Sequence, residues 1–321
     1  MPRYRALYTD IPWAALDLEQ SILDEIDCEL IVPPAEDEAT LASLATDVDA
    51  ILTCWAKVTG KVIDAAPKCR VIARTGIGLD NIDLERATER GIVVTNVPDY
   101  CIPEVVEHTL ALMFALARKI HVYHQSSQRG NYDRAIGMPL ERMEDQTVGV
   151  IGLGKIGGLF AQRCLALGMR VLGNNRSRDV PPGVEWRGVE ELLAESDFVV
   201  LLCPLTDQTH QLINAQSLRL MKPTAALINT SRGGLIDHDA LAQALAANRL
   251  AGAGLDVQVP EPPDMSQAPY NDPRVIVTPH AAFMSTRAIA DLRTRVARQV
   301  VAVLTGQTPE NIVNGVQVPA P

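Results

Sequence analysis

Three short polar segments each follow a predicted strand, and each contributes one side chain that could take part in catalysis. They are Arg232 in residues 229–234, Glu261 in residues 255–262 and His280 in residues 278–282. Parallel strands gather their carboxyl ends at one edge of a sheet, and ligands bind at that edge. We therefore expect these three side chains to lie together.

A cation, a carboxylate and an imidazole suit the reduction of a 2-oxo acid. Hydride delivery to the carbonyl carbon builds negative charge on oxygen, so a positioned proton donor and a fixed positive charge lower the barrier. His280 suits the donor and Arg232 the charge, and arginine also matches a planar carboxylate with two parallel hydrogen bonds. Glu261 beside the imidazole favours its protonated form and fixes its tautomer. A single residue of these types is more often structural, so the hypothesis depends on their joint placement.

A glycine-rich turn lies between two strand patterns. Residues 147–151 indicate a strand, residues 158–172 indicate a helix and a second strand, and Gly152, Gly154 and Gly157 stand between them as Gly-x-Gly-x-x-Gly. The first glycine allows a tight turn, the second lets the backbone approach a pyrophosphate, and the third lets helix and strand pack closely. The helix N-terminus adds amide donors and a favourable dipole. In this context the motif predicts a bound dinucleotide, and the alternative is an ordinary tight turn.

The end of the second strand of this motif normally carries an acidic residue that binds the adenosine ribose hydroxyls. Here Asn175 stands at that position and is followed by Arg176, Ser177 and Arg178. No carboxylate repels a 2′-phosphate, and the two arginines and the serine could bind one. The loop predicts a preference for NADP(H), with NAD(H) as a possible second cofactor. The alternative is that both arginines are solvated loop charges.

The arrangement of these segments is typical of α/β proteins. Short β-branched runs alternate with helical patterns, which predicts βαβ units and parallel sheets. A long apolar helix at about residues 103–119 separates two such series, and an amphipathic helix at 285–304 ends the chain, either rejoining the first series or closing the second. The expected strands are Tyr4 to Tyr8, Glu29 to Val32, Ala50 to Thr53, Val71 to Ala73 and Val93 to Thr95, then runs near Val148, Val171, Val199, Leu227, Gly254 and Ile276.

Composition excludes several classes of function. The 321 residues suggest about two domains, and 29 Lys+Arg against 39 Asp+Glu give a net charge of −10, which disfavours nucleic acid as a partner. Six scattered cysteines lack metal-ligand spacing and predict buried free thiols in a reducing compartment, with no metal site. The longest apolar runs, 110–117 and 198–202, are shorter than the roughly 18 residues of a membrane span. We expect a cytoplasmic protein without a membrane partner.

Several motifs, in order along the whole chain, carry a resemblance to one family. They are Arg-Thr-Gly-Ile-Gly-Leu-Asp-Asn-Ile-Asp at 74–83, the glycine turn, Thr-Ser-Arg-Gly at 230–233, Leu-Asp-Val at 255–257, Glu-Pro at 261–262 and Pro-His-Ala-Ala at 279–282. Together they resemble the D-2-hydroxyacid dehydrogenases. Residues 97–101 and 279–283 are most similar to the branch of the C-terminal binding proteins and the phosphoglycerate dehydrogenases.

This resemblance implies a particular domain organisation. A discontinuous, flavodoxin-like α/β substrate domain would comprise residues 1–98 and 289–321. A central nucleotide domain, residues 99–288, would hold a doubly wound parallel sheet of the Rossmann type. The resemblance also implies a homodimer joined through the nucleotide domain. The apolar helix after Pro103 fits such an interface, although a buried core helix explains it equally well.

The resemblance also implies roles for individual residues. Arg232 would bind the substrate carboxylate and carbonyl, and Glu261 with His280 would form the proton-donating pair. Backbone amides of Ile77 and Gly78 would hold the substrate carboxylate, with Phe283 lining the pocket where the C-terminal binding proteins have tryptophan. Asp256 would contact the nicotinamide amide. The full set of implied cofactor contacts is Gly152, Gly154, Lys155, Ile156, Gly157, Asn175, Arg176, Ser177, Arg178, Cys203, Pro204, Thr209, Thr230 and Asp256.

These observations favour an NADPH-dependent reductase of a small 2-oxo acid, of the glyoxylate or hydroxypyruvate class, that forms a D-2-hydroxy acid. One alternative is a short-form D-3-phosphoglycerate dehydrogenase. Another, of a different class, is a dinucleotide-sensing binding protein similar to the co-repressors of the same branch. The missing partner-binding tail and the Asn175–Arg176 pair disfavour the sensor.

Overall fold

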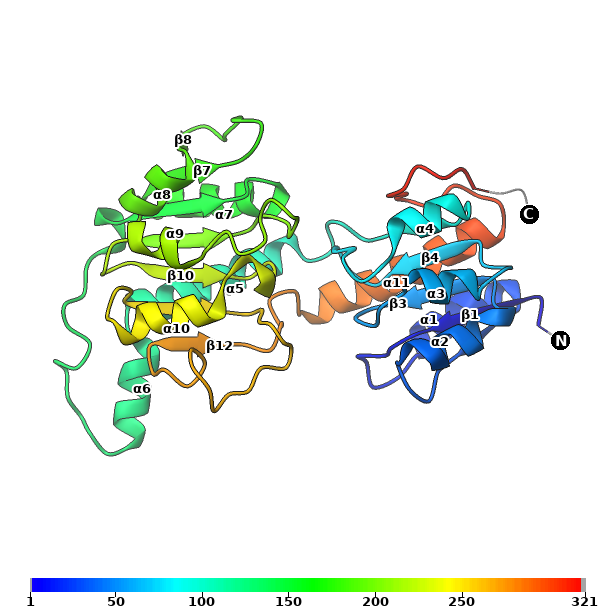
Figure 1. Ribbon diagram of the computed structural model, residues 1–321, viewed down its shortest axis with the longest axis horizontal. Helices are drawn as coiled ribbons and strands as arrows, with labels where there is room; N and C mark the ends of the chain where they lie inside the picture. Colours follow the sequence, from blue (N-terminus) through cyan, green and yellow to red (C-terminus); the bar gives the residue numbers. More distant parts are fainter. Residues whose placement is uncertain (1, 319–321) are drawn as a thin grey trace. The chain divides into compact units, whose positions relative to one another are not determined.

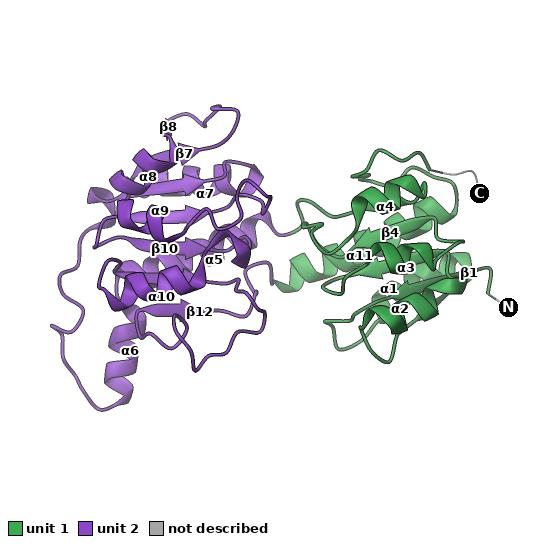
Figure 2. Cartoon of the chain, viewed as in Figure 1, with its two compact units in different colours: residues 1–100, 285–321 green, residues 101–284 purple. Residues whose placement is uncertain are grey.

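The chain folds into two compact units, one of residues 1–100 and 285–321 and one of residues 101–284 (Figure 2). A computed structural model describes residues 2–318. The division falls at residues 100 and 285, where the sequence predicted 98 and 289. Among residues 2–318, no helix combines the length and the apolar character needed to cross a membrane.

Unit 1 contains a five-stranded parallel sheet in the order β2-β1-β3-β4-β5. Helices α1 and α11 cover one face, and α2, α3 and α4 cover the other (Figure 1). Every residue of β3 and β4 is buried, as expected for a parallel sheet with two covered faces. The strands are β1 Tyr4–Tyr8, β2 Cys28–Ile31, β3 Ala50–Thr53, β4 Val71–Arg74 and β5 Val93–Thr95, and the helices are α1 Asp17–Leu23, α2 Glu38–Leu44, α3 Gly60–Asp64, α4 Leu84–Glu89 and α11 Thr286–Leu304.

The C-terminal helix α11 rejoins the first series of strands. Its residues Leu292, Val296 and Val300 repeat every four positions and are buried in the core of unit 1. On its polar side, Arg293 contacts Glu19 and Arg298 contacts Glu25, both on the first helical segment of the same unit. The helix is therefore held by an apolar stripe and by ion pairs.

Unit 2 contains a seven-stranded parallel sheet in the order β12-β11-β10-β9-β6-β7-β8. Helices α5 and α7 pack on one face, and α8, α9 and α10 on the other (Figure 1). The strands are β6 Thr147–Ile151, β7 Arg170–Asn174, β8 Glu185–Trp186, β9 Phe198–Leu201, β10 Ala226–Asn229, β11 Gly252–Leu255 and β12 Val275–Val277, and the helices are α5 Ile102–Ala117, α6 Ile120–Gln128, α7 Lys155–Ala166, α8 Val189–Glu195, α9 Ala215–Leu220 and α10 His238–Ala246.

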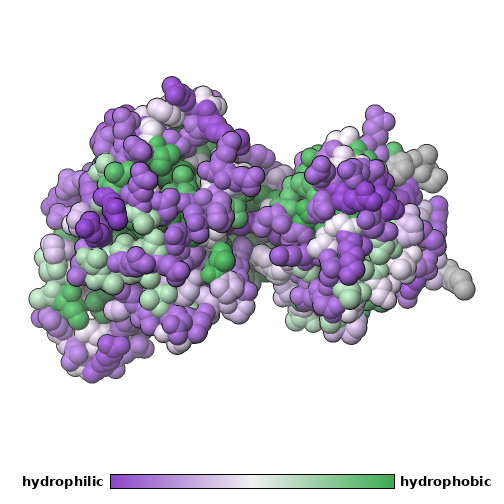
Figure 3. All heavy atoms as spheres, in the orientation of Figure 1, coloured by the Kyte–Doolittle hydropathy of each residue, from purple (hydrophilic) through white to green (hydrophobic). Residues whose placement is uncertain are grey.

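The predicted fold class is confirmed, because each unit is a parallel sheet covered by helices. Unit 1 has the flavodoxin-like strand order and unit 2 the Rossmann order. The sequence missed β8, whose two residues are too short to show a period, and α6, which follows the predicted apolar helix after a break at Lys119. Polar side chains cover most of the face seen in Figure 3, with apolar ones in smaller groups between them.

Candidate active site

The glycine turn connects β6 to α7, at the carboxyl edge of the unit 2 sheet. Gly152 has a φ of +100°, and a Cβ there would lie 2.5 Å from the backbone nitrogen of Cys203. A Cβ on Gly157 would overlap the carbonyl oxygen of Gly152. Both positions therefore require glycine for the backbone path itself.

Gly154 differs from its two neighbours in the motif. Its φ is −69°, and a Cβ built on it would meet no atom within 4 Å. Gly154 is the N-cap of α7, and no side chain caps this helix. A side chain at position 154 would therefore project into space that the chain leaves open at the N-terminus of α7, which begins Lys155-Ile156. A helix N-terminus without a side-chain cap, together with the helix dipole, suits an anion, so the turn fits a dinucleotide pyrophosphate.

The segment after β7 carries the residues predicted to choose between NAD(H) and NADP(H). Arg176, Ser177 and Arg178 are exposed. The amide nitrogen of Asn175 donates to the carbonyl of Asp179, while its side-chain oxygen is buried and accepts no hydrogen bond from the described residues. A buried, unused acceptor at the position that normally recognises ribose is consistent with a ligand hydroxyl there.

The remaining predicted cofactor residues lie in the loops that follow β9 and β10. Cys203 is buried, its carbonyl accepts a hydrogen bond from Ser231 at 2.6 Å, and burial raises the pKa of its thiol to about 11. Thr209 donates its hydroxyl to the carbonyl of Pro204 at 2.7 Å, which closes the 204–209 turn. The hydroxyl of Thr230 lies 2.8 Å from that of Thr109 on α5. In the described structure these groups hold loops in place, and their contacts with a cofactor stay predictions.

His280 and Glu261 form a close pair in the loops after β12 and β11. Nδ1 of His280 lies 2.9 Å from Oε2 of Glu261, and the other oxygen of Glu261 accepts the backbone amide of Gln258 at 2.9 Å. Burial alone raises the pKa of Glu261. The hydrogen bond and charge of His280, the Gln258 amide and the charge of Arg232 outweigh that effect and hold the pKa below its usual range. Glu261 is therefore an ionised partner for the imidazole at neutral pH.

Arg232 follows β10, the strand next to β11. The buried Asn229 at the end of β10 donates to the carbonyl of Arg232 at 2.8 Å and accepts the amide of Ser231 at 3.1 Å. A Cβ on Gly233 would overlap the backbone of Gln258, so the loops after β10 and β11 touch directly. The three predicted catalytic side chains thus come from adjacent loops at one edge, and the charge of Arg232 acts on Glu261.

A buried aspartate braces the loop that carries His280. The carboxylate of Asp256, fully buried, accepts the hydroxyl of Thr278 at 2.6 Å and the amides of Ala281 and Ala282 at 2.9 Å each. The backbone amide of His280 donates to the Asp256 carbonyl at 2.8 Å, and His280 has a φ of +52°, in the left-handed region. Asp256 thereby holds the catalytic candidate in an uncommon backbone conformation.

Nearby contacts extend this brace. His108 on α5 has its Nε2 3.0 Å from the Thr278 hydroxyl, and Thr278 donates to Asp256, so His108 must donate to Thr278. Phe283 lies edge-on to His280 with ring centroids 6.3 Å apart. Sequence reasoning missed the bracing roles of Thr278 and His108, because nothing in a strand pattern shows which loops a side chain connects. The residue spacing of Asp256 and Thr278, each directly after a strand, was the available signal.

Ile77 and Gly78 lie in unit 1, in the loop after β4. Neither backbone amide forms a hydrogen bond within residues 2–318, while the carbonyl of Ile77 accepts the Asn96 side chain at 2.6 Å. Beside this loop, the buried Arg74 stacks on Trp55 with its Cζ 5.6 Å from the ring centroid, and its Nε has no partner among the described residues. Two open amides and a buried arginine suit a carboxylate. Sequence reasoning missed Arg74 because this residue ends a buried strand and so looks structural.

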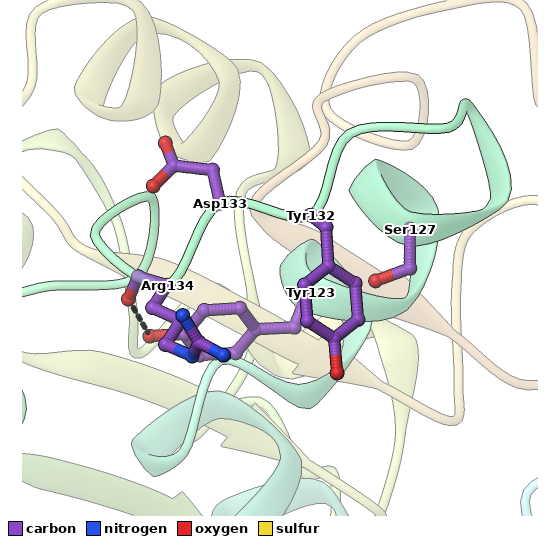
Figure 4. Close-up of a pocket in the computed structure, with 5 residues that line it drawn as sticks. All are labelled: Tyr123, Ser127, Tyr132, Asp133 and Arg134. Atoms are coloured by element: carbon purple, nitrogen blue, oxygen red, sulfur yellow. Dashed lines mark hydrogen bonds between the residues drawn. The ribbon is translucent and has the colours of Figure 1, made fainter.

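A pocket of about 320 Å³ lies elsewhere in unit 2, between α6 and the segment that follows it (Figure 4). Tyr123 donates its hydroxyl to the carbonyl of Arg134 at 3.0 Å, and Ser127 and Tyr132 complete one side. It contains none of the predicted site residues. Among residues 2–318, no group of three or more His, Cys, Asp or Glu side chains is placed to hold a metal ion.

Comparisons with known proteins agree with this geometry. Residues 110–282 match the family model described as D-isomer specific 2-hydroxyacid dehydrogenase, NAD binding domain. A glyoxylate reductase from Pyrococcus furiosus is 38% identical over 285 residues, which cover 84% of this chain and 83% of the relative. A D-3-phosphoglycerate dehydrogenase from Methanocaldococcus jannaschii is 39% identical over 306 residues, which cover 93% of this chain and 57% of the relative.

A solved structure extends the similarity to the full chain. The NADPH-dependent glyoxylate/hydroxypyruvate reductase from Sinorhizobium meliloti, in complex with NADP and malonate, is similar with a TM-score of 0.89 at 28% identity, covering 99% of both chains. The family model and the relatives therefore agree with the motifs read from the sequence. The chain belongs to the D-isomer-specific 2-hydroxyacid dehydrogenase family and is an NAD(P)-dependent oxidoreductase of that family.

Proposed function

We propose that this enzyme reduces a small 2-oxo acid, of the glyoxylate or hydroxypyruvate class, to the D-2-hydroxy acid with NADPH. The 2.9 Å pair of His280 and Glu261 carries the proposal, because it couples a proton donor to an ionised carboxylate. Arg232 adds a cation at the same edge of the sheet. Relatives named glyoxylate reductase and glyoxylate/hydroxypyruvate reductase support this substrate class.

The chain's own residues would perform two tasks, donating a proton and stabilising negative charge. The reduced nicotinamide supplies the hydride that the carbonyl carbon receives. Since Nδ1 of His280 faces Glu261, its Nε2 is the nitrogen that donates a proton to the carbonyl oxygen. Arg232 stabilises the negative charge that develops on that oxygen and binds the substrate carboxylate. Glu261 stabilises the imidazolium before transfer and keeps the ring oriented after it.

We assign the nucleotide to unit 2, and we propose that the backbone amides of Ile77 and Gly78 in unit 1 also contact the substrate carboxylate. The pyrophosphate would bind at Gly154 and the uncapped N-terminus of α7, where a Cβ would meet open space. Asn175, Arg176, Ser177 and Arg178 support NADPH over NADH, because no carboxylate at this loop position repels a 2′-phosphate and the two arginines and the serine could bind it. The unpaired amides of Ile77 and Gly78 support a carboxylate contact in unit 1. Phe283, beside His280, would shape the pocket for the substrate side chain.

We further propose a homodimer and a cytoplasmic location. Helix α5 is part of the unit 2 core, which favours the core reading of that apolar helix. The segment just after it carries several exposed apolar side chains: Ile120, Tyr132, Ile136 and Met138 are 55%, 83%, 46% and 61% exposed. Such a concentration is typical of a protein interface. Replacing Ile136 and Met138 by glutamate should convert a dimer to a monomer in light scattering.

The six buried, free cysteines fit a reducing compartment.

The decisive experiment follows the reduced nicotinamide absorbance with a panel of 2-oxo acids, each with NADPH and with NADH. The panel includes glyoxylate, hydroxypyruvate, pyruvate and phosphohydroxypyruvate. Rapid NADPH-dependent turnover of glyoxylate or hydroxypyruvate supports the proposal. Preference for the phosphorylated acid would favour the phosphoglycerate dehydrogenase alternative, which the Methanocaldococcus relative supports. Cofactor binding without turnover of any acid would favour a dinucleotide sensor.

A further inference from the structure

The loop between β7 and β8, which Figure 1 shows as a ribbon, contains two arginines, Arg176 and Arg178. Arg176 makes no hydrogen bond, ion pair or ring contact with any residue in the range 2–318. Arg178, two positions later, lies over the ring of Trp186 with its Cζ 4.6 Å from the centroid, and its backbone has a φ of +59°. Only one of the two guanidinium groups is therefore held in place by the protein.

Trp186 is a firm support for that contact. It belongs to β8, where it pairs with Gly173 of β7, and it is partly buried. Its indole nitrogen donates to the carbonyl of Asn175 at 3.4 Å. The ring is thus fixed to the sheet by its backbone and to the start of the loop by its side chain. The loop that carries Arg178 is exposed and can move more freely than the strand below it.

Stacking leaves the hydrogen-bonding edge of a guanidinium available. An arginine whose face lies on an aromatic ring keeps its N–H groups pointing sideways, in the geometry that matches phosphate oxygens. Stacking also orders a long side chain before the ligand arrives, so less conformational entropy is lost on binding. The 2′-phosphate is the group that distinguishes NADP(H) from NAD(H), and the carboxyl end of β7 is the place where the adenosine ribose is recognised.

We propose that Trp186 is a specificity-determining residue, which holds Arg178 ready to bind the 2′-phosphate of NADPH. Trp186 acts through Arg178 and is a positioning residue, whereas Arg176 adds charge without a preset geometry. The inference rests on the NADPH preference proposed above. It adds that the preference depends on an aromatic ring in β8, outside the loop that contacts the cofactor.

The test measures dissociation constants of NADPH and NADH by calorimetry for matched variants. Trp186→Leu should raise the NADPH constant about two- to fivefold, the size of an exposed cation–π contact, and leave the NADH constant unchanged. Trp186→Phe, which keeps an aromatic face, should restore most of the loss. In an Arg178→Ala background, Trp186→Leu should cause no further loss. Arg249→Ala, which removes an exposed arginine from the loop after α10, controls for net charge.

Several results would overturn the inference. If Trp186→Leu weakens both cofactors equally, or if its effect adds fully to that of Arg178→Ala, Trp186 is merely structural. Should Trp186→Leu fail to fold, Arg178→Lys keeps the charge and removes the planar stack, and unchanged NADPH affinity would then refute the role. Equal affinity of the unmodified protein for both cofactors defeats the proposed preference and this inference with it. Unequal affinity that ignores Trp186 defeats this inference alone.

Discussion

Each unit of this protein contains a buried aspartate that ties together the loops after two neighbouring strands. In unit 1, Asp10 follows β1, and its carboxylate accepts the backbone amides of Cys54 and Trp55, directly after β3. In unit 2, Asp256 follows β11 and accepts the amides of Ala281 and Ala282, after β12. The chemistry of the two braces is the same, a carboxylate that satisfies loop amides.

The two braces stand at different places in their sheets. Strand order reverses between β1 and β3 in unit 1 and between β6 and β9 in unit 2, and such a switch point is where open α/β sheets bind ligands. Asp10 spans the switch point of unit 1, so the amides there already have an anionic partner. Asp256 stands two strands beyond β9, and the switch point of unit 2 keeps the uncapped glycine turn.

This difference explains how two similar folds serve different tasks. In unit 1 the protein's own carboxylate occupies the place where a Rossmann sheet would take an anion. In unit 2 the corresponding carboxylate belongs to Asp256, which follows β11 and bonds the loop after the edge strand β12. There it holds His280 in its left-handed conformation. The two units therefore differ in what stands at the switch point, the Asp10 carboxylate in unit 1 and the glycine turn in unit 2.

Replacing His280 should have the largest effect. His280→Asn keeps a residue type that tolerates positive φ, so the loop should persist while the proton donor is lost. We expect kcat to fall at least about 10²-fold, with cofactor affinity nearly intact. Steady-state kinetics measures kcat, and cofactor titration measures the affinity. His124→Asn on α6, where the side chain is exposed, is the control. Near-normal turnover of His280→Asn would show that His280 is not the proton donor.

Removing the charge of Asp256 should show which of two roles this residue has: holding the His280 loop in place, or contacting the nicotinamide directly. In Asp256→Asn, one carboxylate oxygen that accepts a backbone N–H is replaced by an NH₂ group, which cannot accept it. The loss should destabilise the His280 loop by about 1–3 kcal/mol. We expect kcat at saturating cofactor to fall about tenfold or more. If Asp256 contacts the nicotinamide instead, cofactor affinity should weaken while saturated kcat holds. Parallel titrations of the two quantities decide between these results.

The equivalent change in unit 1 should act on stability. Asp10→Asn leaves the Cys54 and Trp55 amides with a poorer partner, so we expect unit 1 to lose about 2 kcal/mol of stability. Hydrogen exchange of unit 1 amides, compared with unit 2 amides in the same sample, measures the loss. Dinucleotide affinity should not change. A loss of nucleotide binding in this variant would mean that the unit 1 switch point is not a closed one.

The fold could be predicted from the sequence wherever a strand or helix was long enough to show its pattern of apolar residues. Strands β1, β3 and β5 have the bounds that the sequence predicts. The two-residue β8 could not be predicted, since it is a strand only through its pairing with β7. The packing of α11 on unit 1 was left open by periodicity, because an amphipathic stripe shows that a helix is half-buried and not against which sheet.

The site could be predicted as residue types and less well as contacts. Arg232, Glu261 and His280 each follow a strand, and the rule that parallel strands share a carboxyl edge brings them to adjacent loops. The brace by Asp256 could not be predicted in this way. It depends on where loop backbones place their amides, and this follows from tertiary packing. The stack of Arg178 on Trp186 was missed for the same reason, since β8 itself was missed.

The smallest effect tests whether the unit 2 switch point is open. Gly154→Ala adds a methyl group where the protein has no atom within 4 Å, so thermal stability should be unchanged. The methyl would occupy space needed by the pyrophosphate, and we expect dinucleotide affinity to fall about tenfold, or about 1.4 kcal/mol. Gly158→Ala, one turn into α7 with its nearest contacts at 4.0 Å, should keep full affinity. Gly157→Ala, whose methyl overlaps the Gly152 carbonyl, should lower stability as well. Unchanged affinity in Gly154→Ala would mean that the pyrophosphate does not bind against Gly154.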